Sequence, residues 1–232
     1  MLGSMVLTAA VPAICQDLVT VAPQAAKVEY EDARVRVVRL KIAPHEALPM
    51  HDRPARVVIA LTANDVRITA ADGSTRTVQV PAGNIAWSGP GKRSVTNLDT
   101  PLENVVVEMK ELPHPPPNPG GRVGQPPSKD DPRALVEPHH HWLFENQYVR
   151  VYDVHIPPGG MTEFHRHAYD TVAVEISDGT TAAQTQGGTW GQPEAAQPGS
   201  VEFLADSKKT RIHRVRNEGK AEYHVVLVQL LQ

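Results

Sequence analysis

The sequence has little cysteine, few aromatic residues and no long apolar run. It has one cysteine in 232 residues, Cys15, so no disulfide can form within the chain. No apolar stretch reaches the roughly 18 residues that a membrane-spanning helix needs. Lys and Arg number 23 against 26 Asp and Glu, and the chain lacks the basic stripe that is typical of nucleic-acid-binding proteins. These absences argue against a disulfide-stabilised scaffold, a membrane span and a nucleic-acid partner.

The sequence also lacks any segment with a sustained helical period. Instead, 21 prolines and 16 glycines separate short apolar runs such as 57–61, 103–108 and 225–230. Many short strands bounded by turn residues are typical of a β-sandwich or β-barrel. The predicted fold class is therefore all-β.

The first residues, Met1 to Cys15, are apolar and small. They are similar to the apolar core and cleavage zone of a secretory signal without its basic start. We treat 1–23 as a candidate signal or N-terminal segment, which predicts export to the periplasm. An ordinary N-terminal strand or tail of a cytoplasmic protein is the alternative.

The chain contains an internal repeat, detected by a shift of 114 residues. This shift aligns 35–37 with 149–151, both Val-Arg-Val, and lays His51 on His165. Between the copies, 113–138 holds nine prolines, which cannot donate to a sheet. We therefore predict one domain at 24–112, a Pro-rich linker at 113–138 and a second domain at 139–232.

Three histidines of the second copy form the strongest chemical signal. His165 and His167 stand two apart and would share one face of a strand, and His213 follows on a later strand. If the sheet closes into a barrel, the three imidazoles can meet. Such a set suits one divalent transition metal ion, with iron, nickel, copper, zinc and manganese all left open.

These histidines belong to two longer motifs. Gly159, His165-Arg166-His167 and Gly179 match the first, and Pro198-Gly199, His213 and Asn217 match the second. In these motifs the second domain resembles the cupins, which are small β-barrels of jelly-roll type. The whole chain resembles a bicupin, with two tandem cupin barrels joined by the Pro-rich linker.

The second domain departs from the cupin pattern at one position. The acidic metal ligand of that pattern would fall on Thr171 or Val172, which leaves a three-histidine site. Some cupins use three histidines, among them thiol dioxygenases and diketone-cleaving dioxygenases. Glu163, two residues before His165, is a weak candidate for a fourth ligand, a general base or a partner that holds a ligand. Tyr169 is a weak candidate for a proton donor.

The first domain departs further. His51 is kept, but Arg53, Val57 and Arg93 stand at the remaining ligand positions. A guanidinium has no lone pair to donate, so we expect no metal in this domain. The two arginines could bind a carboxylate or phosphate. Alternatively, they pair with local acids such as Asp52 or simply reach solvent.

Other histidines and aromatic residues carry weaker predictions. We expect the His139–His141 run to be an exposed entry segment and His155 to lie on the outer face of a strand. Four aromatic residues are expected in the core, namely Trp142, Phe144, Phe164 and Phe203.

Together these patterns predict a metal-binding cupin with a small-molecule ligand or substrate. A metal-dependent enzyme of the dioxygenase type is favoured. A lyase or isomerase on a sugar or small acid, and a non-catalytic bicupin that binds a small ligand or metal, are the alternatives. A homodimer and a monomer whose two barrels cover each other's edges are both compatible with the sequence.

Overall fold

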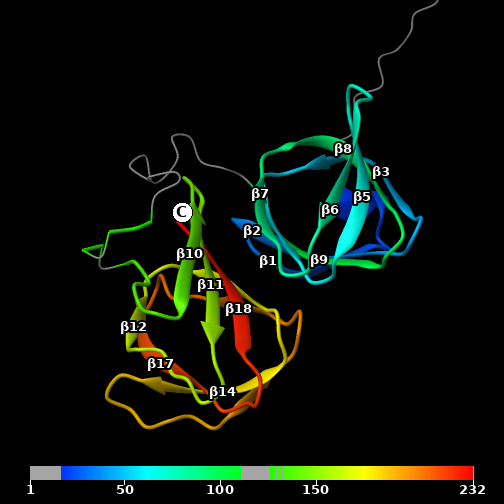
Figure 1. Cartoon of the computed structure of the whole chain (residues 1–232). Helices are drawn as coiled ribbons and strands as arrows, with labels where there is room; N and C mark the ends of the chain where they lie inside the picture. The colour runs from blue at the N-terminus through cyan, green and yellow to red at the C-terminus, as the bar shows by residue number, and fades with distance from the viewer. Residues whose placement is uncertain (1–16, 111–125, 129, 132, 232) are drawn as a thin grey trace, which may run out of the picture.

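The computed structural model describes residues 17–110, 126–128, 130, 131 and 133–231, and in this part the chain forms two β-barrels (Figure 1). The first barrel holds one short helix and nine strands: α1 (Leu18–Val21), β1 (Ala26–Glu31), β2 (Val35–Ile42), β3 (Ala47–Arg53), β4 (Arg56–Ala60), β5 (Asn64–Ala70), β6 (Thr75–Val80), β7 (Ile85–Ser88), β8 (Gly91–Asn97) and β9 (Leu102–Met109). The second barrel holds nine more: β10 (His140–Glu145), β11 (Val149–Ile156), β12 (His165–His167), β13 (Thr171–Glu175), β14 (Gly179–Thr185), β15 (Glu194–Ala196), β16 (Val201–Leu204), β17 (Arg211–Asn217) and β18 (Tyr223–Leu230).

The two barrels repeat one topology. Each has a five-stranded sheet, in the order β1-β2-β9-β4-β7 in the first and β10-β11-β18-β13-β16 in the second. Each also has a four-stranded sheet, β3-β8-β5-β6 and β12-β17-β14-β15. Adding nine to each strand number of the first barrel gives the second, and all strand pairs are antiparallel. The all-β fold of two tandem barrels that the sequence predicted is therefore present.

The five-stranded sheets are apolar on both faces. In β2, Val38 and Leu40 point into the first barrel while Val35 and Val37 join a core that both barrels share. Side chains alternate across a strand, so such a sheet must be covered on its outer face as well. Each barrel supplies that cover for the other, and the shared core holds valines from both: Val35, Val37, Val57, Val105, Val107, Val149, Val151, Val172, Val174, Val226 and Val228.

Aromatic and polar contacts fix the two barrels against each other. Tyr30 of β1 stacks on Phe203 of β16 with ring centroids 4.3 Å apart, and Trp87 of β7 stacks on Tyr148 at 5.8 Å. Arg34 donates to Asp170 across the interface at 2.6 Å. The barrels therefore form one packed unit in which each protects the outer sheet face of the other.

The packed regions extend beyond the predicted domain limits. Leu18 and Ala22, in and beside α1, are buried in the core of the first barrel, although both fall within 1–23, the predicted signal or N-terminal segment. Leu135, within the predicted linker, is buried in the core of the second barrel. Most of the candidate signal (1–16) and much of the linker (111–125) lie outside the described residues. Within the described part, no helix has the length and hydropathy that crossing a bilayer requires.

Candidate metal centre

The register of the four-stranded sheet brings the three predicted histidines together. In the β12–β17 pair His165 stands opposite His213, and His167 stands opposite Arg211. Directly opposed residues lie on the same face of a sheet, and this face points into the second barrel. The ring centroid of His213 lies 4.7 Å from that of His165 and 4.9 Å from that of His167, and the last two are 4.9 Å apart.

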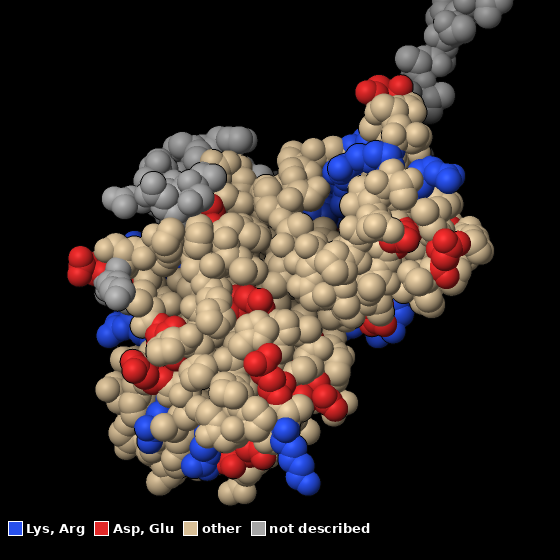
Figure 2. All heavy atoms as spheres, in the orientation of Figure 1, with Lys and Arg blue, Asp and Glu red and all other residues tan. Residues whose placement is uncertain are grey.

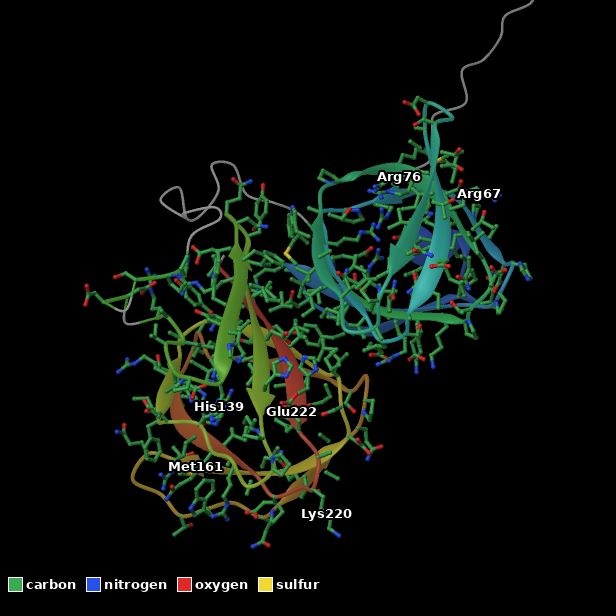
Figure 3. The ribbon with its side chains drawn as sticks, viewed as in Figure 1. Arg67, Arg76, His139, Met161, Lys220 and Glu222 are labelled. Carbon is green, nitrogen blue, oxygen red and sulfur yellow. The ribbon has the colours of Figure 1, made fainter. Side chains whose placement is uncertain are left out.

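A fourth histidine, His140, reaches the same place from β10. Its ring centroid lies 4.5 Å from that of His165 and 6.4 Å from that of His167. One ring nitrogen from each of His140, His165 and His167 lies within 4.8 Å of the other two, a spacing that fits ligation of one ion. The prediction that 139–141 is an exposed entry segment is wrong for His140, which is buried; Figure 3 labels the neighbouring His139.

The carboxylate of Glu137 orients the ring of His140 by a hydrogen bond. The Nδ1 of His140 donates to Oε1 of Glu137, and both side chains are buried. Burial by itself would raise the pKa of Glu137, but the hydrogen bond and the charge of His140 bring it below its usual value. A carboxylate that accepts from Nδ1 leaves Nε2 with the lone pair and makes the imidazole a better metal ligand. This pair was not predicted, although Glu137 and His140 stand close together in the sequence.

The nitrogen atoms of these rings suit a metal. His165 donates from Nδ1 to the carbonyl of Glu163 at 2.9 Å, which leaves its Nε2 as the lone-pair nitrogen. Both nitrogens of His167 and Nε2 of His213 are buried without a hydrogen-bond partner. Buried polar atoms are rarely left unpaired. A divalent ion would pair with one nitrogen of His167 and with Nε2 of His213, so the residues present fit the metal that the motifs imply.

Burial also keeps the histidines neutral. It lowers the pKa of His165 to about 4 and that of His213 to about 2, with the charge of Arg211 acting in the same direction. The pKa of His167 is well below its usual value for the same reasons. Neutral imidazole is the form that binds a metal, so these rings need no deprotonation at neutral pH.

Arg211 places a cation beside the histidines. Asp206 holds its guanidinium through two contacts of 3.1 Å, and Nη1 lies 3.3 Å from Nδ1 of His213. A guanidinium only donates, so in this contact Nδ1 accepts and the ring proton is on Nε2. A metal bound at Nε2 requires the other tautomer. Metal binding at Nε2 of His213 would therefore break the contact between Nη1 of Arg211 and Nδ1 of His213. Arg211 would keep its bonds to Asp206.

The histidines line a cavity of about 390 Å³ inside the second barrel. Its walls include apolar side chains such as Val154, Ala173 and Leu227, and Glu175 and Tyr223 add a buried polar pair. The hydroxyl of Tyr223 donates to Oε1 of Glu175 at 2.8 Å, while Oε2 is buried without a partner. Burial raises the pKa of Glu175 to about 7. This carboxyl was missed because nothing local distinguishes it from a solvent-facing strand residue.

The two weak catalytic candidates lie elsewhere. Glu163 is exposed and precedes β12, which begins at His165, so the strand alternation that would align the two does not apply. Tyr169 lies against the guanidinium groups of Arg133 and Arg150, 5.4 and 5.8 Å from its ring centroid. Neither residue is among those that line the cavity, and their roles stay predictions.

The structure also shows which residues occupy the position of the acidic ligand in the cupin pattern. Thr171 is fully buried and its hydroxyl donates to the carbonyl of Tyr169 at 3.0 Å, while Val172 faces the core between the barrels.

Of the aromatic residues predicted as core, Phe144 and Phe203 pack on the shared core and Trp142 packs on the core of the second barrel. Phe164 is 41% exposed, so that prediction is wrong. His155, as predicted, lies on the outward-facing side of its strand, half-buried.

In the first barrel the same positions hold arginines. His51 stands opposite Arg93 in the β3–β8 pair, as His165 stands opposite His213. The equivalent of Thr171 is Arg56, because Val57 and Val172 both face the shared core. The assignment of Val57 to the ligand position is therefore shifted by one residue. Arginines take three ligand positions in this barrel and a single histidine remains.

Comparisons with solved structures agree with this geometry. A cupin 2 conserved barrel domain protein from Leptotrichia buccalis matches with a TM-score of 0.53 at 11% identity, over 88% of each chain. An oxalate decarboxylase from Lactobacillus farciminis, solved as its formate complex, matches with a TM-score of 0.57 at 16% identity, over 88% of this chain and 83% of that one. Bacillus subtilis oxalate decarboxylase, described with Mn(II) centres, matches with a TM-score of 0.54 at 14% identity, over 88% of this chain and 74% of that one.

These matches span both barrels, and the fold of this chain is the cupin fold in two tandem copies. A scan of protein-family models and a search of the curated proteins gave no match. At such identities the likeness defines the fold alone. The chemistry must be argued from the residues in the cavity.

Proposed function

We propose that the second barrel is a metal-dependent enzyme that acts on a small organic anion. The proposed ligands are His165, His167 and His213, with His140 as a fourth imidazole at the same centre. The observation that carries the proposal is the set of buried, neutral ring nitrogens without partners in the wall of a cavity. A divalent metal there would supply Lewis acidity to a bound substrate and, if it were iron or copper, redox chemistry with oxygen.

The cavity supports a small substrate that carries negative charge. Its volume of about 390 Å³ falls within the roughly 300–1,000 Å³ of typical small-molecule sites. Arg211 borders it, and a guanidinium binds carboxylates in a bidentate manner. The oxalate decarboxylase neighbours act on a small dicarboxylate by name, which supports this substrate class for the present chain.

A dioxygenase-type reaction remains the favoured class. Four imidazoles and no carboxylate at the centre leave the full charge of a divalent ion available to an anionic substrate. Three of them, His165, His167 and His213, match the three-histidine pattern of the dioxygenase-type cupins that the sequence resembles. In this reaction Arg211 would orient the substrate, and the apolar wall would exclude water.

A redox-neutral lyase, isomerase or decarboxylase is the second candidate, and one observation favours it. Glu175 has a pKa of about 7, which is suited to giving or taking a proton at neutral pH. The hydroxyl of Tyr223 holds its Oε1, so Oε2 is the oxygen that can face a substrate. A proton carried on Oε2 would serve such a reaction and has no role in simple ligand binding.

Metal content and oxygen use test the proposal together. Protein purified without an affinity tag is analysed for metals by inductively coupled plasma mass spectrometry and compared with a His165→Ala/His213→Ala double variant and a His51→Ala control. We expect about one metal per chain in the wild type and in the control, and none in the double variant. Turnover of small carboxylic acids is then measured with and without oxygen.

Each outcome has a defined meaning. Oxygen uptake with iron or copper supports the dioxygenase type. Turnover with manganese or zinc in the absence of oxygen supports the lyase type, and its loss in Glu175→Gln assigns the proton to Glu175. Metal and ligand binding without turnover of any acid overturns the enzyme and leaves a binding protein. Absence of metal after reconstitution overturns the metal site itself.

A further inference from the structure

The interior of the first barrel carries a concentration of positive charge. Four arginines come from four strands, Arg53 on β3, Arg56 on β4, Arg76 on β6 and Arg93 on β8. Figure 2 shows Lys and Arg side chains gathered at one end of this barrel, and Figure 3 labels Arg76 there. Figure 1 locates that end by the hairpin of β5 and β6.

Strand register shows that these arginines face inward. Arg93 stands opposite His51, which is buried, and Arg53 is two residues further along the same strand. Arg76 stands opposite Ile68, which packs on the core of the first barrel. Arg56 is only 2% exposed. The arginines therefore share the interior face that, in the second barrel, carries the metal-site histidines.

Carboxylates compensate only part of this charge. Glu108 lies 3.1 Å from Arg56 and also binds Arg36, which in turn binds Asp17. Asp52 lies between His51 and Arg53 on the strand, hence on the opposite face, and pairs with Lys92 at 3.9 Å. The hydrogen bond that the structure gives to Arg93 runs to the hydroxyl of Ser88, at 3.2 Å.

The arginine charges repel one another. Burial, followed by the charges of Arg56 and Arg93, lowers the pKa of Arg53 to about 9. Burial and the charge of Arg76 lower the pKa of Arg93. Arg53 is still protonated at neutral pH, because a pKa of about 9 lies above neutrality. Buried like charges are costly unless a counter-charge lies among them.

The arrangement also has an open side. Arg76 is exposed and Arg53 and Arg93 are half-buried, while Arg56 and Glu108 close the inner side. One guanidinium nitrogen of Arg56, Nη2, is buried without a partner. Donors that lie on one interior face and come from four strands match an oxyanion with several acceptor oxygens, since each guanidinium can bind two of them.

We propose that the first barrel binds a small oxyanion of two or more negative charges, a dicarboxylate or a phosphate, between Arg53, Arg76 and Arg93. The barrel is thus a second ligand site and not only a support for the metal barrel. The guanidinium groups of Arg53 and Arg93 occupy strand positions that metal-ligand histidines occupy in the second barrel. A guanidinium donates hydrogen bonds to an anion, whereas an imidazole gives a lone pair to a metal.

Thermal unfolding of the full chain in the presence of anions tests this site. The probes are inorganic phosphate and malonate, each compared with sodium chloride at equal ionic strength. At a hundredfold excess over the dissociation constant, a specific anion should raise Tm by roughly 5–10 °C above chloride. A larger response to phosphate or to malonate identifies the preferred oxyanion. Titration calorimetry of Arg211→Gln, which lacks the guanidinium of the second-barrel cavity, should then give one site per chain.

Matched variants locate the binding. When it is combined with Arg211→Gln, the double variant Arg53→Gln/Arg93→Gln should abolish the anion response. It should also raise Tm in the absence of anion, because repulsion is relieved. Arg67→Gln is the control, since Arg67 lies on β5 between the inward Val66 and Ile68 and is exposed. Arg211→Gln excludes the cation of the second barrel as the source, and the response should persist in it.

Two results would overturn the proposal. One is a wild-type Tm that responds to phosphate and malonate no more than to chloride. The other is an anion response that survives when the arginine double variant is combined with Arg211→Gln, or that disappears in Arg211→Gln alone. If the combined variant does not fold, Arg93→Gln added to Arg211→Gln should weaken anion binding at least tenfold in calorimetry, and unchanged binding there rejects the site.

Discussion

Arg53 of the first barrel stands at the position that His167 holds in the second. Each residue lies two places after a buried histidine on the strand, His51 or His165, and faces the interior of its own barrel. One duplicated backbone thus presents a guanidinium in one copy and an imidazole in the other. Because the two groups differ in charge and in lone pairs, the same geometry serves an anion in one barrel and a metal in the other.

Glu137 should tune the metal affinity, whereas Glu163 should not. Glu137→Gln keeps an acceptor for Nδ1 of His140 but removes the negative charge behind the ring. We expect metal affinity to fall by about 10- to 100-fold, as is usual when the carboxylate partner of a ligating histidine is changed. Competition with a chromogenic chelator measures the affinity. Glu163→Gln is the control, since Glu163 is exposed, and equal losses in the two variants would contradict the assignment.

Arg211 should oppose the metal. Its charge lowers the pKa values of His165, His167 and His213, and its contact with Nδ1 of His213 favours the tautomer that cannot bind through Nε2. Arg211→Gln should therefore tighten metal binding several-fold while raising the KM of an anionic substrate.

The same competition assay checks the Arg211 effect. Arg214→Gln is the matched control, because the guanidinium of Arg214 lies over Phe164 and Trp190 instead, at 4.7 and 5.1 Å from their ring centroids. Weaker metal binding in Arg211→Gln than in wild type would show that Arg211 supports the centre instead.

Glu175 should make stability depend on pH. Burial raises its pKa from 4.5 to about 7, so the native state holds the proton more tightly than the unfolded chain. Its contribution to the free energy of unfolding is full below pH 4.5 and is lost as the pH rises to about 7. Relative to wild type, Glu175→Gln should gain up to about 3 kcal/mol between pH 5 and pH 8.

Urea unfolding at the two pH values measures this gain. Glu194→Gln is the control, since Glu194 is exposed on β15 of the same barrel. A stability difference between Glu175→Gln and wild type that stays constant from pH 5 to pH 8 would show that Glu175 titrates normally.

Met109 should matter to both barrels. It is 1% exposed in the core that the two barrels share, so Met109→Ala should cost about 2–5 kcal/mol of unfolding free energy. Both barrels should lose stability together, with far-UV circular dichroism and tryptophan fluorescence changing in one transition. Met161, 40% exposed, gives the control Met161→Ala with little effect. Two separate transitions in the wild type would show that the barrels unfold independently.

Much of the fold could be predicted from local patterns. The alternation of Val35 and Val37 with inward residues, and its repetition at Val149 and Val151, gave strands and a duplication. The pairing of His165 with His213 was also accessible, because the motif spacing defines which strands carry them. The exact ends of the packed regions, at Leu18 and Leu135, were not predicted, since burial of a flanking segment depends on what it meets.

Other parts of the site were beyond the sequence. His140 and Glu175 reach the cavity because the barrel closes and brings β10 and β13 toward β12, and no local period records that closure. Strand alternation does not align Glu163 with His165, because β12 begins only at His165, two residues after Glu163. Placement relative to a strand end depends on sheet pairing and not on the residue itself.

The sequence by itself determined which residues alternate on each strand and therefore which types stand on a common face. It placed imidazoles in one copy and guanidinium groups in the other. Only the tertiary structure decided which faces meet, what lies behind each group and which charges stay unpaired. Those outcomes depend on long-range packing of sheets, where contacts join residues far apart in the chain. Burial in these sheets sets the strength of every interaction between charged groups.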